Sequence, residues 1–163
     1  MREVRTKPAA ALPRVGPLPR PATPAEAREV LKAEAFPAPD VQAVTLTATE
    51  FTSICPRTGQ PDFGSVIIAY APAARCLESK ALKYYLWSYR DEGAFCETLA
   101  GRIADDVVYA IAPRAVRVEV SQTVRGGIAI VAEARRGKGE GGRGKGDTGM
   151  GTGEEGRGKG KAR

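Results

Sequence analysis

The chain has 163 residues, enough for one domain, and its 25 Lys and Arg residues against 19 Asp and Glu leave a net charge of +6. It contains no histidine, which excludes histidine-based catalysis and His-ligated metal sites. Three cysteines without a CxxC pair predict no metal and a reduced, cytoplasmic protein, and no apolar run of about 18 residues predicts a membrane span.

The basic excess lies at the two ends of the chain. Residues 1–23 are rich in Pro, Ala and Arg, and residues 136–163 divide into the seven-residue units RGKGEGG, RGKGDTG, MGTGEEG and RGKGKAR. Both segments have too few apolar side chains to offset the entropy of ordering, so we expect disorder. The basic tail can be interpreted as a weak RNA contact or as low-complexity sequence without a specific role. The folded domain is predicted to span residues 24–135.

The pattern within this domain predicts six main elements after a short first helix. Thr23 and Pro24 are a favourable helix start, and that helix runs to about Ala33. Strands are predicted over residues 41–49 and 65–70, helices over 79–92 and 94–111, and strands over 115–120 and 127–133. Each strand pair is joined closely enough to form an antiparallel hairpin. The fold class is therefore α+β, an antiparallel sheet with two helices on one face.

Both longer helices show an apolar face with helical spacing. The first has Leu82, Tyr85, Leu86 and Tyr89, and the second has Phe95, Leu99, Ile103, Val107 and Ala110. We expect these faces to be buried against the sheet.

The first stretch with chemical potential is ICPRTGQPDFG, from Ile54 to Gly64. Cys55 directly follows the first main strand, and Asp62 lies in what reads as the same Pro- and Gly-rich loop. A thiol and a carboxylate in one loop can serve as nucleophile and proton donor. They can equally be a buried small residue and a turn-forming residue, and the stretch alone leaves both interpretations open.

Two further stretches carry charge near the start of a helix. In LESKALKYY, Lys80 and Lys83 project from the first turns, an arrangement suited to phosphates or simply to solvent. In AFCETLAG, Glu97 lies early in the next helix, where a carboxylate usually complements the helix dipole.

Together, CPRTGQPDF, ESKALKYY and FCE resemble the NADPH-dependent 7-cyano-7-deazaguanine reductases, the nitrile reductases of queuosine biosynthesis in tRNA modification. The resemblance covers about residues 28–133, and RGGI at 125–128 fits the family's last hairpin. It implies the tunnelling fold, related to GTP cyclohydrolase I, in which subunits pair strands side by side into a barrel. It also implies a homo-oligomer, such as a decamer.

The resemblance further implies the reaction and its site residues. Cys55 would add to the nitrile carbon as a covalent thioimide, Asp62 would donate a proton to the nitrogen, and NADPH would supply two hydrides. The residues implied to contact the substrate are Leu77, Glu78, Ser79, Cys96 and Glu97. Those implied to bind the NADPH phosphates are Lys80, Lys83 and, more weakly, Arg125.

Cys96 departs from the family pattern, because the family usually has histidine there. A thiol is a poor hydrogen-bond donor and cannot carry a positive charge, so either the site works without the imidazole or the chemistry has changed. One alternative function is therefore a related tunnelling-fold enzyme that forms an amidine from the nitrile with ammonia. A second alternative is a non-catalytic RNA-binding relative.

Overall fold

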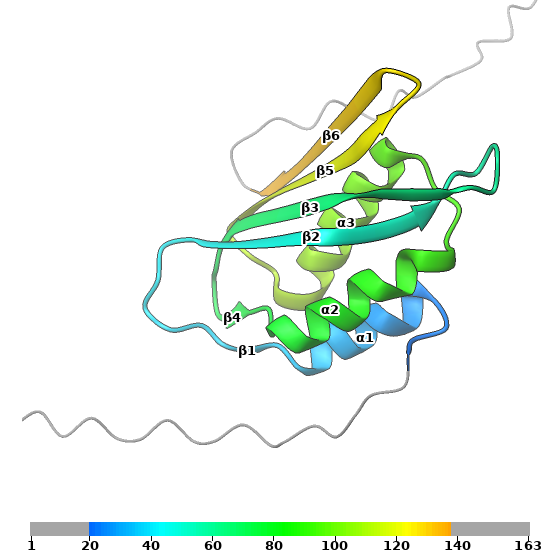
Figure 1. Ribbon diagram of the computed structural model, residues 1–163. Coiled ribbons are helices and arrows are strands. Elements are labelled where there is room, and N and C mark those ends of the chain that lie inside the picture. Colours follow the sequence, from blue (N-terminus) through cyan, green and yellow to red (C-terminus); the bar gives the residue numbers. More distant parts are fainter. Residues whose placement is uncertain (1–19, 138–163) are drawn as a thin grey trace, which may run out of the picture.

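The computed structural model describes residues 20–137, which form one four-stranded antiparallel sheet with helices on one of its faces (Figure 1). The strand order is β2 (Val44–Ile54), β3 (Pro61–Ala71), β5 (Ala115–Arg125) and β6 (Ile128–Gly137). The predicted α+β class and both hairpins are confirmed. The strands are longer than the sequence predicts, and they bring the two hairpins together through the pairing of β3 with β5.

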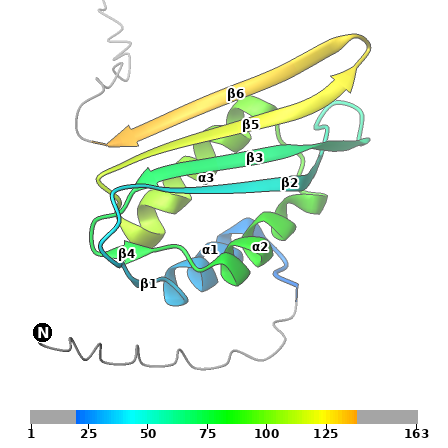
Figure 2. The ribbon, with the colours of Figure 1, turned by 60° about the vertical axis from the view of Figure 1, so that its left-hand side comes forward.

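Three helices cover the inner face of the sheet in two layers (Figure 2). The long helix α3 (Cys96–Ile111) packs on β5 and β6, while α2 (Ser79–Ser88) and the short 3₁₀ turn Tyr89–Asp91 lie beneath β2. The first helix, α1 (Pro24–Ala33), packs against α2 and α3, so it adds a second layer. It begins as predicted, with the Thr23 hydroxyl accepting from the Glu26 N–H at 3.2 Å.

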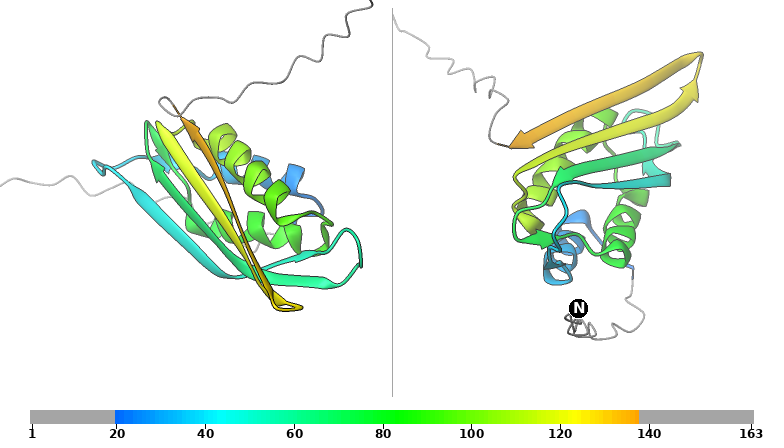
Figure 3. Two further views of the ribbon diagram at one scale, coloured as in Figure 1. Left: turned by 90° about the horizontal axis from the view of Figure 1, so that it is seen from above. Right: turned by 90° about the vertical axis from the view of Figure 1, so that its left-hand side faces the viewer.

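The core forms where alternating strand residues meet the helix stripes, and the views from above and from the side show this layering (Figure 3). The inward strand residues include Val66, Ile68, Val118 and Val120, each at most 1% exposed. The predicted stripe of α2 is buried, as are Leu99, Ile103, Val107 and Ala110 of α3. The prediction for Phe95 is wrong. It precedes the first turn in an extended conformation, so helical spacing does not apply, and it is 53% exposed.

A two-residue pair that the sequence does not predict closes the other end of the layer. β1 (Phe36–Pro37) pairs antiparallel with β4 (Arg75–Cys76), directly before α2. The Arg75 guanidinium also donates to the carbonyls of Lys32 and Ala35, at 3.0 and 2.7 Å, which satisfies acceptors at the end of α1. The pair therefore sets where α2 begins.

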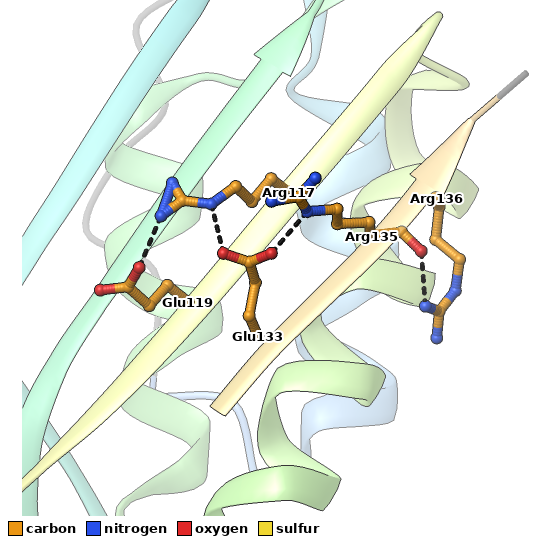
Figure 4. Close-up of polar contacts among 5 residues, drawn as sticks. All are labelled: Arg117, Glu119, Glu133, Arg135 and Arg136. Atoms are coloured by element: carbon orange, nitrogen blue, oxygen red, sulfur yellow. Dashed lines mark hydrogen bonds and ion pairs between the residues drawn. The ribbon is translucent and has the colours of Figure 1, made fainter. Parts of the chain in front are cut away.

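The outer face of the sheet carries a row of ion pairs across β5 and β6 (Figure 4). Arg117 contacts Glu119 at 2.5 Å and Glu133 at 2.6 Å, and Arg135 contacts Glu133 at 2.5 Å. Arg136 donates to the Arg135 carbonyl and pairs with Asp105 of α3. These contacts lie in the last part of β6. The strand itself pairs with β5 through Gly137, two residues beyond the predicted domain boundary. The remainder of the predicted tail, and residues 1–19, lie outside the described residues.

Within residues 20–137, no helix is both long and apolar enough to cross a membrane.

Candidate active site

Cys55 is the first residue of the tight loop that joins β2 to β3. Its N–H donates to the Gln60 carbonyl, and its own carbonyl accepts from the Gly59 N–H, each at 2.9 Å. Gly59 has a φ of +70°, a left-handed conformation that glycine adopts without steric cost. The loop therefore comprises only residues 55–60 and curls back over the cysteine.

This curl activates the Cys55 thiol. A hydrogen bond from the Thr58 side chain, followed by the N–H groups of Arg57 and Thr58, lowers the pKa of the Cys55 thiol to about 7. Burial opposes them with a smaller effect, and the Arg125 side chain adds the smallest lowering. A large share of this thiol is ionised at neutral pH. The thiolate is the nucleophilic form of cysteine, so the loop prepares Cys55 to attack an electrophile.

Asp62 lies on strand β3, so the prediction that it shares a loop with Cys55 is wrong. The β2–β3 hairpin is tighter than its Pro and Gly content suggests, and it puts Asp62 directly opposite Ser53 of β2. Asp62 is only 5% exposed, and its carboxylate forms an ion pair with Arg125. The Gln122 side-chain amide donates to its second oxygen at 3.4 Å. The hairpin still brings the thiol and the carboxylate to one end of the inner face.

The start of α3 is attached to the same end of the sheet by backbone hydrogen bonds. Ile54, the residue before Cys55, donates its N–H to the Glu92 carbonyl at 2.9 Å and accepts from the Ala94 N–H at 3.2 Å. The result is a short parallel bridge between Ile54 and Gly93. It brings Cys96 and Glu97 close to the Cys55 loop, although they are more than forty positions away in the sequence.

The N-cap residue of α3 and the first two residues of the helix have different surroundings. Phe95 and Glu97 are exposed, so an aromatic ring and a carboxylate are both available at the rim of the site. Cys96 is only 2% exposed, and its thiol donates to the Val120 carbonyl at 3.3 Å. Burial, followed by the negative charge of Glu97, raises the pKa of the Cys96 thiol, so it stays protonated where Cys55 ionises. The exposure of Phe95 is the feature that sequence reasoning missed.

Glu78 caps the N-terminus of α2. It is the N-cap residue, and its carboxylate accepts from the N–H groups of Lys80 at 2.9 Å and Ala81 at 2.8 Å. Partial burial acts to raise its pKa, but these bonds and one from the Ser79 hydroxyl outweigh burial and lower it. Leu77, buried just before it, donates its N–H to the Tyr70 hydroxyl at 3.1 Å. Two N–H groups of the α2 N-terminus are thus already satisfied by Glu78.

A groove of about 1310 Å³ runs between α2 and strand β2 and reaches the site through Gln122. Ser79 and Lys83 line it, together with the rings of Tyr84 and Trp87 and the cation of Arg90. Lys80 is half-buried at the start of the same helix. Cations and flat aromatic surfaces along one open groove are what phosphates and planar rings require, so these residues fit a dinucleotide.

The structure thus pairs Asp62 with Arg125 at the end of the sheet where the Cys55 loop begins, and the start of α3, with Cys96 and Glu97, is attached to the same end. Lys83 and Ser79 lie along the groove rather than in this cluster. Among the described residues, no group of three or more His, Cys, Asp or Glu side chains is placed to hold a metal ion.

Comparisons with known proteins agree on one family. The model of a family described as QueF-like protein matches residues 61–140. An NADPH-dependent 7-cyano-7-deazaguanine reductase of Anaeromyxobacter sp. (strain Fw109-5) is 53% identical over 95 residues, covering 58% of this chain and 78% of the relative. The reductase of Syntrophus aciditrophicus (strain SB) is 51% identical over 112 residues, covering 67% of this chain and 80% of the relative.

Among solved structures, the crystal structure of the archaeosine synthase QueF-Like in the apo form is similar to this chain with a TM-score of 0.59 and 26% sequence identity. The match covers 63% of this chain and 100% of that structure. It confirms the predicted fold.

Proposed function

The chain belongs to the family of NADPH-dependent 7-cyano-7-deazaguanine reductases, and on this premise we propose that it reduces the nitrile of 7-cyano-7-deazaguanine to an aminomethyl group, a step of queuosine biosynthesis. The observation that carries this proposal is that the Cys55 thiol, whose pKa is about 7, and the buried Asp62 carboxylate, which is paired with Arg125, lie at the same end of the sheet, where α3 begins. A nitrile accepts hydride poorly, and thiol addition converts it into a C=N group that is reduced more readily.

In the first step, the Cys55 thiolate forms a bond to the nitrile carbon, and one π bond of the C≡N group breaks. Asp62 takes up the proton that the Cys55 thiol releases and then gives it to the nitrile nitrogen, so the covalent thioimide forms without net gain or loss of protons. The low exposure of Asp62 supports this role, because a buried carboxyl delivers its proton to a neighbour rather than to water.

We propose that substrate recognition comes from the start of α3 and from the 77–79 turn. The exposed Glu97 carboxylate can accept two hydrogen bonds from the guanine-like N–H groups, and the Phe95 ring beside it offers a planar surface. Glu78 holds the backbone of Leu77 and Ser79 in place by capping α2. Cys96 occupies the position of the family's histidine, with its thiol bonded to Val120.

NADPH, when bound, supplies one hydride to the thioimide carbon and a second to the imine that follows. We propose that Lys83 and Lys80 bind its phosphates with their side chains, since Glu78 already accepts from N–H groups of the α2 N-terminus. The groove along α2 leads from these lysines toward Gln122, which contacts Asp62. After the first hydride transfer and before the second, the Cys55 sulfur leaves the carbon as a thiolate. The lowered pKa of Cys55 makes it a better leaving group.

We propose that the chain works as a homo-oligomer in the cytoplasm. Strands β2 and β6 are both edges of the sheet, and exposed edges are usually covered. Val124, Ile128 and Val131, at the end of the β5–β6 hairpin, are each more than 60% exposed, which favours pairing with another copy. Sedimentation of the purified chain tests this. A monomer at micromolar concentration contradicts it. Free thiols at all three cysteines suit a reducing compartment.

The covalent step can be tested without NADPH. Purified protein mixed with 7-cyano-7-deazaguanine should gain the mass of the nitrile at Cys55, and later addition of NADPH should consume two equivalents for each amine formed. Cys55→Ala should show neither event, and Asp62→Asn should form the adduct slowly and not turn over. The absence of an adduct in the unchanged chain contradicts the proposal. Amidine formation with ammonia, and no NADPH consumption, would instead assign the alternative chemistry.

A further inference from the structure

The Arg125 side chain lies between the two groups proposed to react. Its guanidinium forms an ion pair with the Asp62 carboxylate, and it contributes to the lowered pKa of the Cys55 thiol. We propose that Arg125 is a positioning residue for nitrile addition, holding the Asp62 carboxylate beside the Cys55 thiolate as one unit. This inference rests on the proposed function, and it gives Arg125 a role other than contact with the NADPH phosphates.

The shape of the β5–β6 hairpin directs the Arg125 side chain toward Asp62 on the β2–β3 hairpin. The register of β5 and β6 shifts between Gln122 and Arg125, so the last residues of β5 bulge out of the regular ladder. The Thr123 hydroxyl donates to the Phe63 carbonyl of β3 at 3.1 Å, which attaches this bulge to the strand that carries Asp62. The turn at Gly126–Gly127 has positive φ values of +57° and +80°, which end β5 directly after Arg125.

The burial of the two partners shows why Asp62 needs this contact. The Asp62 side chain is 5% exposed, whereas Arg125 is 45% exposed. A buried carboxylate without a counter-charge is strongly unfavourable, and Arg125 supplies that charge from the solvent side. Gln122 donates to the second carboxylate oxygen at 3.4 Å. One carboxylate oxygen thus pairs with Arg125 and the other accepts from Gln122, and these two contacts with β5 fix the orientation of the carboxylate.

The same guanidinium acts on the thiol. Thr58 and the N–H groups of the loop contribute most of the lowering of the Cys55 pKa, and Arg125 adds a smaller contribution. Arg57 provides only its backbone N–H to the thiol, so its side chain is a matched control for Arg125. Both arginines are exposed, but only the Arg125 guanidinium pairs with Asp62 and acts on the Cys55 thiol.

The test compares the full chain with its Arg125→Gln, Arg125→Lys and Arg57→Gln variants in two assays. The first follows iodoacetamide modification of Cys55 across pH. The second follows adduct formation with 7-cyano-7-deazaguanine without NADPH. In Arg125→Gln, the midpoint of modification should rise above about 7, and adduct formation should slow about 10- to 100-fold. Arg125→Lys should recover much of the midpoint but less of the rate, and Arg57→Gln should match the unchanged chain.

Two results would overturn the inference. One is an Arg125→Gln variant with the unchanged midpoint and adduct rate, and a raised KM for NADPH alone, which would make Arg125 a phosphate ligand. The other is an equal effect of Arg57→Gln, which would make the effect one of general charge. If the unchanged chain forms no adduct at all, the proposed function fails, but the iodoacetamide assay still decides the contact of Arg125 with the thiol.

Arg125→Gln leaves Asp62 buried without its counter-charge, so this variant can lose stability. The double variant Asp62→Asn with Arg125→Gln removes both charges and should fold like the unchanged chain. Its iodoacetamide midpoint should be raised as in the single variant, and an unchanged midpoint there would also contradict the inference.

Discussion

Ser53 and Asp62 lie directly opposite each other on β2 and β3, facing the helices, with 1% and 5% exposure. The Asp62 carboxylate is held by Arg125 and Gln122. The Ser53 hydroxyl, by contrast, has no hydrogen-bond partner among the residues that the structure describes. A buried hydroxyl that forms no hydrogen bond destabilises the folded state.

Ser53→Ala should therefore raise the free energy of unfolding by about 1 kcal/mol, because it removes a buried hydroxyl that forms no hydrogen bond. Urea denaturation measures the change. Ser88→Ala is the matched control. Ser88 is 2% exposed, but its hydroxyl donates to the Tyr85 carbonyl at 2.6 Å, so its loss should destabilise by about 1 kcal/mol. Equal losses in both variants would mean that Ser53 has a partner in solution.

The reactivity of Cys55 should depend on pH around neutrality. Its pKa is lowered from 9.0 to about 7, so the thiolate fraction, and with it the rate of alkylation, should rise between pH 6 and pH 8 with a midpoint near 7. Cys76 and Cys96 are buried, and they should stay unmodified in the folded chain. Peptide mass mapping after timed iodoacetamide treatment distinguishes the three. A midpoint near 9 would mean that the loop does not stabilise the thiolate.

Gly64 permits a very close approach of β3 to β5. A Cβ atom at this position would lie 2.0 Å from the Ser121 carbonyl oxygen, which is backbone and cannot rotate away. Gly64→Ala should destabilise the fold by about 3 kcal/mol or more, and it should also disturb Asp62 two residues earlier. Thermal unfolding and the adduct assay measure both effects.

The control for this substitution is Gly101→Ala in α3. A Cβ there meets only the Arg136 guanidinium, at 3.9 Å, and alanine is the better helix former, so stability should rise by about 0.5–1 kcal/mol. Similar melting temperatures for the Gly64 variant and the unchanged chain would contradict the close approach of the strands.

Cys96→Ala should leave adduct formation and turnover near the level of the unchanged chain, because the thiol is buried and bonded to Val120. A loss comparable to that of Cys55→Ala would make the Cys96 thiol part of the chemistry. The companion variant Cys96→His introduces a larger side chain at a position that is 2% exposed. It should lower the melting temperature through overpacking, and steady-state turnover measures whether the imidazole then speeds reduction.

Local pattern was sufficient for much of this fold. The apolar spacing of Leu82, Tyr85, Leu86 and Tyr89 predicted a buried helix face, and all four are buried. The position of Cys55 at the end of a strand was also predictable, since β-branched residues end and Pro56 follows. These features depend on residues that are neighbours along the chain, so periodicity and turn chemistry report them directly.

Features that depend on pairing between distant segments were not predictable in the same way. Asp62 reads as a loop residue beside Pro61, and only the register with Ser53 makes it a buried strand residue. The aim of Arg125 depends on the bulge after Gln122, and a register shift leaves no periodic signal. The exposure of Phe95 follows from the attachment of residues 92–94 to Ile54, which backbone groups alone produce.

That attachment has a consequence for how such a site can diversify. Amide and carbonyl groups join Ile54 to Glu92 and Ala94, and these groups are the same whatever side chains the neighbouring positions carry. The first turn of α3 can therefore exchange its side chains while the Cys55 loop keeps its place. Under the proposed function, the cysteine at position 96 is one such exchange, which changes a side chain near the Cys55 loop and leaves the backbone hydrogen bonds of Ile54 unchanged.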